Sequence, residues 1–276
     1  MKIKIQYLVV ALLACLSLLT PVNVSANMTE LKPMSILLLG TDTGALGRDE
    51  VGRSDVIMVM TINPATERVT LTSIPRDTYV EIVGRGTKDK INHAYAFGGP
   101  QMSMDTVNQL FQMKLDHYIV VNMKGIEQIV DAVGGIDVTP PTSFEITGFT
   151  FNAGETTHIN GEQALAYARE RYTSGGDYAR QERQREIIQA VMSKVSTADS
   201  IFNLQEILTA MNQNVQTDLN MVTILQLFSE YRDKVGEIET HQLSGTGTMI
   251  DGVYYDLADE SILSETIQRI ANELAE

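Results

Sequence analysis

The stretch SILLLGTD, residues 35–42, gives the first strong indication of the fold. Its run of Ile and Leu is typical of a buried strand, and Gly, Thr and Asp follow where that strand should end. Two more strand-like runs come next, VIMVMTI at residues 56–62 and VTLTSI at residues 69–74, with the turn signal Asn63-Pro64 between them. If each run pairs with the one before it, the three form an antiparallel meander, the simplest connection.

Helical and strand patterns continue along the rest of the chain. Asn160 with Gln163 three positions later resembles a capping box, and Asp177 can cap the helix that follows it. The predicted helices cover residues 100–113, 123–133, 160–168 and 178–196, with two more after residue 201 and a last one from residue 259. Further predicted strands cover residues 79–83, 117–121 and 237–242. No linker rich in Pro, Ser or Gly divides this pattern, so we expect one mixed α/β domain over residues 33–276.

Residues 1–28 are typical of a targeting segment. Lys2 and Lys4 precede a stretch without charge that is rich in Leu, Val and Ala. As a helix, residues 5–22 would span about 27 Å, close to the ~30 Å hydrocarbon core of a bilayer, with the positive flank in the cytoplasm. We expect an uncleaved membrane anchor that leaves the domain on the extracellular face.

Two alternatives to the anchor remain open. Val24-Ser25-Ala26 resembles the cleavage site of a secretory signal, and residues 12–15 loosely resemble a lipid-attachment site. Cys15 is the only cysteine of the chain. An exported domain would therefore contain no disulfide, no thiol nucleophile and no cysteine metal site.

The charge balance argues against nucleic acid as a partner. The chain has 21 basic and 35 acidic residues, a formal net charge of −14. Proteins that follow a phosphate backbone usually present a basic face. Any binding of phosphate must therefore depend on a local concentration of basic residues.

Acidic residues occur where the three strands of the meander should meet. Asp42 follows the first strand, Asp55 opens the second, and Arg76 and Asp77 follow the third. An antiparallel meander brings these positions to one edge of the sheet. Two carboxylates beside arginine suit Mg²⁺ with a phosphate ligand, because Mg²⁺ takes few protein carboxylates and completes its shell with phosphate and water. The alternative interpretation is that the aspartates only cap turns and strand ends.

The segment ARERYTSGGDYARQERQR, residues 168–185, holds five of the twelve arginines. On the predicted helix from residue 178, Arg180, Arg183 and Gln184 continue the inward apolar stripe, whereas Gln181 and Arg185 point elsewhere. Buried arginines require an anionic partner, which is either an internal carboxylate or a phosphate ligand at the start of the helix.

Arg169 and Arg171 precede this helix, and we expect them to be extended and parallel, because the helical pattern fades after residue 168. Arginine forks bind phosphate oxygens in pairs. The segment therefore predicts a site for a pyrophosphate.

Seven segments in order resemble the LytR–CpsA–Psr family. They are ILLLGTD (36–42), RSD (53–55), SIPRD (73–77), KINHAY (90–95), VGGIDV (133–138), INGEQALAYARER (159–171) and GGDYARQERQ (175–184). The resemblance covers about residues 35–196. Ala179 departs from the family pattern, which usually has Gly before the first Arg of the last segment.

The resemblance implies a membrane-anchored phosphotransferase, found mainly in Gram-positive bacteria, that moves a teichoic acid or capsular polysaccharide from an undecaprenyl-pyrophosphate carrier to peptidoglycan. A muramic acid hydroxyl would attack phosphorus, and the polyprenyl phosphate would leave. The implied fold is an α/β/α sandwich with a central mixed sheet and an apolar lipid-binding tunnel. The implied partners are the lipid-linked glycan, peptidoglycan and the membrane.

The resemblance also assigns residues. Asp42 and Asp55 match the Mg²⁺ ligands, with Mn²⁺ as an alternative metal. Asp42 is the favoured base, with Asp77 as its alternative, and Asn92 and Tyr95 lie in a matching segment without a clear role. The expected catalytic set is Asp42, Arg76, Arg169 and Arg171, and the expected pyrophosphate-binding set is Arg53, Arg76, Lys90, Arg169, Arg171, Arg180, Arg183 and Gln184.

Three other functions compete with transfer. A DNA-binding regulator conflicts with the export segment and the acidic composition. A protein that only binds polyprenyl phosphates would keep the arginines without needing the aspartates. A pyrophosphatase would use water in place of the sugar hydroxyl.

Overall fold

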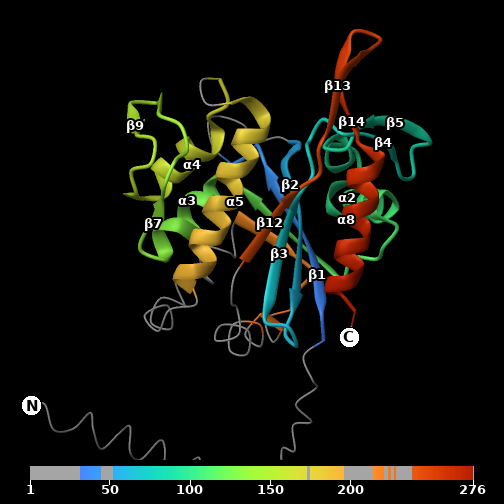
Figure 1. Ribbon diagram of the computed structural model, residues 1–276, viewed down its shortest axis with the longest axis horizontal. Coiled ribbons are helices and arrows are strands. Elements are labelled where there is room, and N and C mark those ends of the chain that lie inside the picture. The colour runs from blue at the N-terminus through green and yellow to red at the C-terminus, as the bar shows by residue number, and fades with distance from the viewer. Residues whose placement is uncertain are drawn as a thin grey trace, which may run out of the picture. The chain divides into compact units, whose positions relative to one another are not determined.

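Among the residues that the structure describes, six strands form a central mixed sheet in the order β11-β6-β1-β2-β3-β12 (Figure 1). The computed structural model describes residues 32–44, 52–172, 175–195, 214–220, 223–224, 227 and 238–275. The sheet strands are β1 (Met34–Thr41), β2 (Ser54–Asn63), β3 (Arg68–Ser73), β6 (His117–Asn122), β11 (Val215–Thr217) and β12 (Ile238–Gln242).

The predicted meander is confirmed. β1 pairs antiparallel with β2, and β2 pairs antiparallel with β3. β6 and β12 extend the sheet in parallel to β1 and β3, respectively. A register shift after Gly40 pairs Thr41 with Ser54, so the residues that follow β1 and open β2 lie at the same edge of the sheet.

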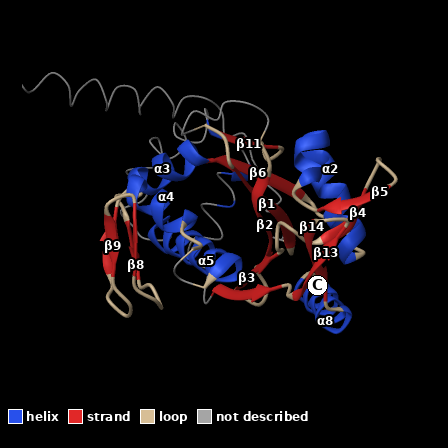
Figure 2. Ribbon diagram, turned by 90° about the horizontal axis from the view of Figure 1, so that it is seen from above, coloured by secondary structure: helices blue, strands red, loops and turns tan. Residues whose placement is uncertain are grey.

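Two helices, α2 (His93–Phe111) and α8 (Glu260–Glu273), cover one face of the sheet (Figure 2). They bury a core that includes Leu37, Val59, Val107 and Ile270. α2 starts at His93, earlier than the helix predicted from residue 100. Its backbone departs from helical φ and ψ angles only at Gly98 and Gly99, and the helix continues after this kink. Asp259 caps α8 by accepting hydrogen bonds from the first turn.

Three helices lie over the opposite face: α3 (Met123–Ala132), α4 (Gly161–Arg169) and α5 (Gly176–Val195) (Figures 1 and 2). They share a second core with four short strands, β7 (Ile136–Val138), β8 (Phe144–Ile146), β9 (Phe149–Phe151) and β10 (Thr157–Ile159). The sheet between two helical layers confirms the α/β/α arrangement.

The predicted helix boundaries on this side lie within about two residues of the observed ones. Both halves of the capping box form, since Gln163 N donates to the Asn160 side chain and Asn160 N donates to the Gln163 side chain. Asp177, predicted as the cap of the long helix, instead lies in its first turn, because α5 begins at Gly176. A carboxylate there still interacts favourably with the helix dipole.

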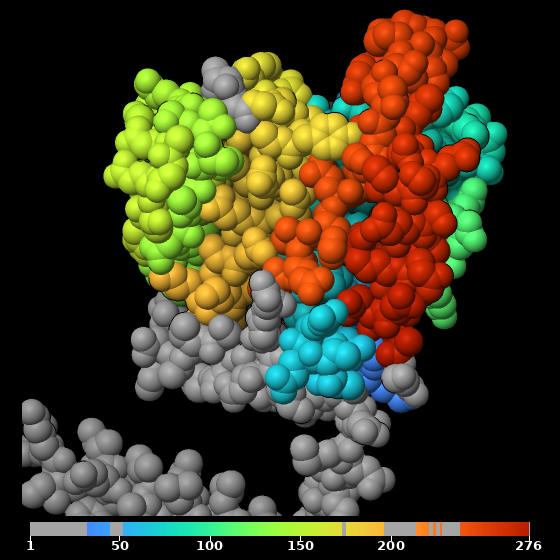
Figure 3. All heavy atoms as spheres, viewed as in Figure 1, coloured from blue at the N-terminus to red at the C-terminus, as the bar shows by residue number. Residues whose placement is uncertain are grey.

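Two hairpins complete the described part. β4 (Tyr79–Ile82), which matches the predicted strand 79–83, pairs with β5 (Thr87–Lys90). β13 (Gly245–Ile250) pairs with β14 (Val253–Ala258) around Asp251-Gly252 and projects from the body as a narrow arm in red-orange (Figures 1 and 3). The sequence patterns did not predict β5, β7–β10, β11 or this second hairpin.

The leader, residues 1–28, lies outside the described residues, and so does most of the region 201–237 where two helices were predicted. Of the helices that are described, none combines the length and the apolar character needed to cross a bilayer.

Candidate functional site

A cavity of about 780 Å³ lies between the sheet and the α3–α4–α5 layer. Its charged and polar lining consists of Thr41, Asp42, Arg53, Asp55, Arg76, Asp77, Lys90, Asn92, Arg169, Arg171, Tyr172, Arg180 and Gln184. Its apolar lining includes Leu38, Ile119, Val121, Ile126, Ile129, Leu165, Ile188, Val191 and Met192. One cavity therefore joins the edge of aspartates and the arginine segment, which are more than 90 residues apart in the chain.

The two kinds of lining occupy different stretches of α5. Arg180 and Gln184 contribute to the cavity from the first half of this helix, and Ile188, Val191 and Met192 contribute from the second half. At 1.5 Å per residue, Arg180 and Met192 are about 18 Å apart along the axis. The cavity thus has a charged end and an apolar end.

Asp42 and Asp55 stand at neighbouring strand ends, as predicted. Asp42 accepts a hydrogen bond from the backbone N–H of Arg53 at 2.9 Å, which ties the end of β1 to the start of β2. Gly52 lies close beside it, since a Cβ at that position would be 2.2 Å from Oδ1 of Asp42 and would force this carboxylate to move. Both aspartates line the cavity.

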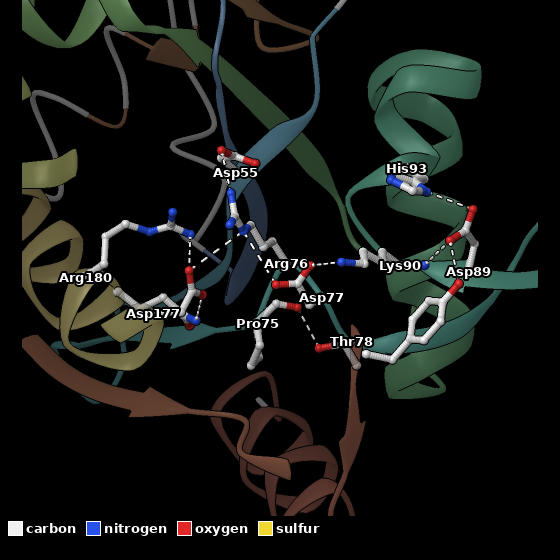
Figure 4. A network of polar contacts seen from close by, with 12 residues as sticks. Asp55, Pro75, Arg76, Asp77, Thr78, Asp89, Lys90, His93, Asp177 and Arg180 are labelled. Atoms are coloured by element: carbon white, nitrogen blue, oxygen red, sulfur yellow. Dashed lines mark hydrogen bonds and ion pairs between the residues drawn. The ribbon is translucent and has the colours of Figure 1, made fainter. Parts of the chain in front are cut away.

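Arg76 links the sheet edge to α5 (Figure 4). Its Nη1 lies 2.8 Å from Asp55 Oδ2, and its Nε lies 3.7 Å from both Asp77 Oδ2 and Asp177 Oδ1. Burial disfavours the charged guanidinium, but Asp55, Asp177 and Asp77 outweigh that effect and raise the pKa of Arg76. The side chain is therefore a permanent cation held in place by carboxylates from three segments.

Lys90 and Asn92 add polar groups from the KINHAY segment. Lys90 Nζ contacts Asp77 Oδ1 at 2.7 Å (Figure 4). Asn92 is buried, and its Oδ1 has no hydrogen-bond partner among the described residues. Tyr95 instead packs against the core beneath α2, so the structure brings only the first two to the cavity.

Arg180 is the buried cation of the site, with 5% of its surface exposed. Its Nη2 lies 2.6 Å from Asp177 Oδ1, whereas its Nε has no hydrogen-bond partner among the described residues. Burial lowers the pKa of Arg180, Asp177 opposes this, and nearby Arg76 lowers the pKa further. Burying a cation with unused donors is costly, so an anion in the cavity would stabilise it.

Arg169 and Arg171 both line the cavity, but not in the predicted extended conformation throughout. Arg169 is the last residue of α4, and Glu170 after it has an extended backbone. The capping residue therefore turns the chain so that arginines on both sides of it reach the same cavity.

Arg183 does not join them. Its guanidinium is 1% exposed and donates to the carbonyl oxygens of Tyr167 and Glu170 at the end of α4. It also contacts the carboxylate of Glu170 at 3.3 Å. Of the two partners that the sequence left open, the structure supplies the internal carboxylate, and Arg183 fixes the turn between α4 and α5.

Arg185 points away from the cavity, as predicted, but it is buried against the sheet and not solvated. Its Nη1 donates to Ser73 Oγ at 3.0 Å and to Gln242 Oε1 at 3.2 Å, which attaches α5 to β3 and β12. Two of the five arginines in residues 168–185, Arg183 and Arg185, are thus structural.

The charged end of the cavity can bind a strongly anionic group. Six basic side chains line it against three carboxylates, in a chain that is acidic as a whole. Guanidinium groups bind phosphate oxygens in pairs, and a partly enclosed site strengthens the attraction. The arrangement suits a pyrophosphate with an apolar substituent.

The carboxylates fit a divalent cation. Asp42 and Asp55 provide hard oxygen ligands at adjoining strand ends in the same cavity, which matches the one or two carboxylates that Mg²⁺ usually takes. Within the described ranges no cluster of three or more His, Cys, Asp or Glu side chains could hold a metal. A cation here would need further oxygens from its ligand and from water.

Sequence reasoning missed Asp177 as a partner of the cations and Tyr172 as a lining residue. Asp177 was treated as a helix cap, although its spacing of three residues from Arg180 predicts an ion pair on a helix. The apolar lining from α3 was not predicted either, because the amphipathic pattern of that helix does not show which part of the protein its apolar side faces.

Comparisons with known proteins agree with the fold. The model of the LytR_cpsA_psr family matches residues 17–272. An Enterococcus faecalis protein named polyisoprenyl-teichoic acid–peptidoglycan teichoic acid transferase TagU is 46% identical over 249 residues, which is 90% of this chain and 82% of that protein.

Solved structures are similar over the same region. Bacillus subtilis TagU has a TM-score of 0.71 and 38% identity, over 89% of this chain and 98% of the other. TagT bound to LIIa-WTA has a TM-score of 0.73 and 28% identity, over 88% of this chain and 91% of the other.

Proposed function

This chain belongs to the LytR–CpsA–Psr family, and from that premise we propose that it transfers a teichoic acid from a polyprenyl-pyrophosphate carrier to peptidoglycan. The observation that carries the proposal is the single cavity with a cationic end and an apolar end. A polyprenyl pyrophosphate has the same division, with two phosphates at one end of a hydrocarbon chain. The names of the relatives favour teichoic acid over capsular polysaccharide as the polymer.

The apolar end would hold the lipid. Side chains of α3, α5 and β6 form this part, and Ile126, Ile129, Ile188 and Val191 are among them. Removing hydrocarbon from water is favourable by roughly 25 cal/mol per Å², so a long prenyl chain gains substantially from such a lining. This end would act as the lipid-binding tunnel, with the tail between the sheet and the helices.

The cationic end would hold the pyrophosphate. Arg169, Arg171 and Arg180 converge from α4 and α5, and Arg53, Arg76 and Lys90 converge from the sheet side. Phosphoryl transfer depends mainly on positioning and on neutralising charge. The arginines would offset the charge that develops on the leaving polyprenyl phosphate.

Asp42 and Asp55 would hold Mg²⁺, with Mn²⁺ as an alternative. The metal would act as a Lewis acid on the phosphate oxygens. Asp55 contacts Arg76 at 2.8 Å, so Arg76 then exchanges this carboxylate for a phosphate oxygen. Substrate binding would thus replace internal ion pairs by contacts with the ligand.

Asp42 would also accept the proton of the attacking hydroxyl. The hydroxyl oxygen of the acceptor forms a bond to the phosphorus next to the glycan, the bond from this phosphorus to the bridging oxygen breaks, and polyprenyl phosphate leaves. Asp77 is less suited to the role, because its carboxylate already contacts Lys90 at 2.7 Å and Arg76 at 3.7 Å. The reaction would take place on the outer face of the cell membrane.

The test is a transfer assay. The full chain in detergent micelles with Mg²⁺ is given a polyprenyl-pyrophosphate-linked teichoic acid and peptidoglycan. We expect a phosphodiester between the teichoic acid and muramic acid, with polyprenyl monophosphate as the second product. Tight donor binding without products would support a binding protein. Free teichoic acid phosphate in the presence of acceptor would support a pyrophosphatase.

A further inference from the structure

The hairpin β13–β14 is attached directly to the site. Asp256 N donates to the carbonyl oxygen of Asp77 at 2.9 Å, which fixes the base of the hairpin to the segment after β3. On its other side, Tyr178 of α5 donates through its hydroxyl to Asp256 Oδ2 at 2.8 Å and accepts from Gly245 N at 3.2 Å. The hairpin is therefore positioned by residues next to the cavity.

One face of this hairpin is turned toward α5. Gly247 pairs with Asp256, and Met249 pairs with Tyr254. These four residues lie on one face of the hairpin. It is the face from which the Asp256 side chain contacts Tyr178 of α5. We call Gly245, Gly247, Met249, Tyr254 and Asp256 the hairpin face. The opposite face packs through Tyr255 on Tyr79, with ring centroids 4.7 Å apart.

The hairpin face presents an aromatic ring over a glycine floor. A Cβ on Gly247 would lie 2.5 Å from the hydroxyl oxygen of Tyr254 and 2.8 Å from its ring, so only glycine lets the ring lie across the strand. Tyr254 remains 47% exposed and Met249 62% exposed. Both side chains are thus largely open to solvent on this face.

The ring lies close to the cationic end of the cavity. Lys90 Nζ is 6.0 Å from the centroid of Tyr254, and the same atom contacts Asp77 in the cavity. Tyr172, which lines the cavity, is 83% exposed beside Arg171. An acceptor molecule whose hydroxyl reaches the cationic end of the cavity can therefore extend along the protein surface to Tyr254.

The chemistry of the hairpin face favours a neutral sugar. The face of an aromatic ring carries partial negative charge and attracts the polarised C–H groups of a pyranose. Residues 245–258 contain two aspartates and no lysine or arginine. Binding to an anionic lipid surface or to a polyphosphate chain normally requires such basic residues.

We propose that the hairpin face holds the acceptor glycan strand, with one sugar next to the reacting residue stacked on Tyr254. This rests on the proposed transfer to peptidoglycan. The donor fills the cavity and the acceptor lies along the hairpin, so its hydroxyl meets the phosphorus at the junction marked by Asp77.

Binding tests the inference without turnover. Uncrosslinked peptidoglycan glycan strands are titrated into the full chain in detergent, and affinity is compared between wild type, Tyr254→Ala and Tyr254→Phe. Loss of one aromatic anchor should weaken binding about tenfold in Tyr254→Ala, and Tyr254→Phe should stay near wild type. Leu257→Ala is the matched control, since Leu257 is 40% exposed on the opposite face.

Kinetics separate this inference from the proposed function. Tyr254→Ala should raise the acceptor KM by about tenfold and leave the donor KM unchanged. If wild type binds the strands, Tyr254→Ala binds them more weakly and neither transfers, the proposed function fails and the hairpin inference stands. If Tyr254→Ala binds the strands as tightly as wild type, the inference fails. Loss of binding to phosphatidylglycerol vesicles in Tyr254→Ala, with glycan affinity unchanged, would overturn it in favour of a membrane surface.

Discussion

Arg76 Nε lies 3.7 Å from Asp177 Oδ1, and this ion pair joins the two halves of the site, the sheet edge and α5. The same guanidinium contacts Asp55 Oδ2 at 2.8 Å on the sheet side. The aspartates of the sheet edge and the arginine segment are thus linked through Arg76 before any ligand binds. These ion pairs offset part of the positive charge of the arginines while no anionic substrate is bound.

Arg183→Ala should lower stability. Its removal takes one donor away from the buried Glu170 carboxylate and from two carbonyl oxygens, and breaking a buried pair typically costs roughly 3–5 kcal/mol. Chemical denaturation of the purified protein measures the free energy of unfolding. If the free energy of unfolding is unchanged and binding of the donor is lost, Arg183 would instead belong to the phosphate-binding residues.

Arg169→Ala should show the reverse. The residue is exposed at the end of α4 and lines the cavity, so its loss should reduce transfer by about 10²–10³-fold without changing Tm. Arg85→Ala is a suitable control, because Arg85 is an exposed arginine that stacks on Phe97. Near-normal transfer in Arg169→Ala would remove this residue from the reaction.

Asp55→Asn should weaken the binding of Mg²⁺. Losing one charged ligand should raise the Mg²⁺ concentration for half-maximal transfer roughly tenfold or more. EDTA should abolish wild-type activity, and added Mg²⁺ should restore it. Asp77→Asn, a carboxylate of the same cavity, should leave the half-maximal concentration unchanged. Equal shifts in both variants would contradict the assignment.

Ile188→Trp should obstruct the apolar end of the cavity. Filling this space should raise the KM for an undecaprenyl donor about tenfold, whereas a short-chain prenyl donor should be unaffected. Ile188→Val keeps the space and should behave as wild type. If both donors respond equally to Ile188→Trp, the lipid tail lies elsewhere.

Asp256→Asn should stabilise the fold at neutral pH. Burial raises the pKa of Asp256, the hydrogen bond from Tyr178 opposes this, and Asp77 and Asp177 add to it. A folded pKa above the unfolded value means that the protonated form is stabilising and that this contribution is lost as pH rises through the folded pKa. The Tm of the variant should therefore exceed that of wild type at neutral pH.

The difference should disappear in acid, below the ordinary Asp pKa of about 3.9. Asp259 provides the opposite sign, since hydrogen bonds from the start of α8 lower its pKa. Asp259→Ala should reduce Tm at neutral pH, and this loss should shrink in acid. A Tm difference for Asp256→Asn that does not change with pH would rule out titration of Asp256 as its cause.

Local patterns predicted the parts of the fold that depend on local physics. The apolar runs of β1, β2 and β3 and the capping box of α4 follow from residue spacing alone. The short strands β7–β10 were missed, because three residues carry too little periodicity. The β13–β14 hairpin could have been found, since Asp251-Gly252 has the positive φ angles of a type I′ turn and follows a common sequence signal.

The site was predictable where a residue type allows few roles. Asp42, Asp55 and Arg76 meet because adjacent antiparallel strands must end at the same edge. Arg183 and Arg180 lie on the same side of one helix, and only the tertiary position of Glu170 separates a structural arginine from one that faces the cavity. Spacing along a helix cannot make that distinction.

The central claim is that one cavity holds both the diphosphate and the lipid. A structure of the full chain with Mg²⁺ and a polyprenyl-pyrophosphate-linked glycan tests it most directly. We predict phosphates among Arg76, Arg169 and Arg180, a metal between Asp42 and Asp55, and the prenyl chain along Ile126 and Val191. Phosphates bound away from these arginines, or a lipid tail outside the cavity, would contradict the account.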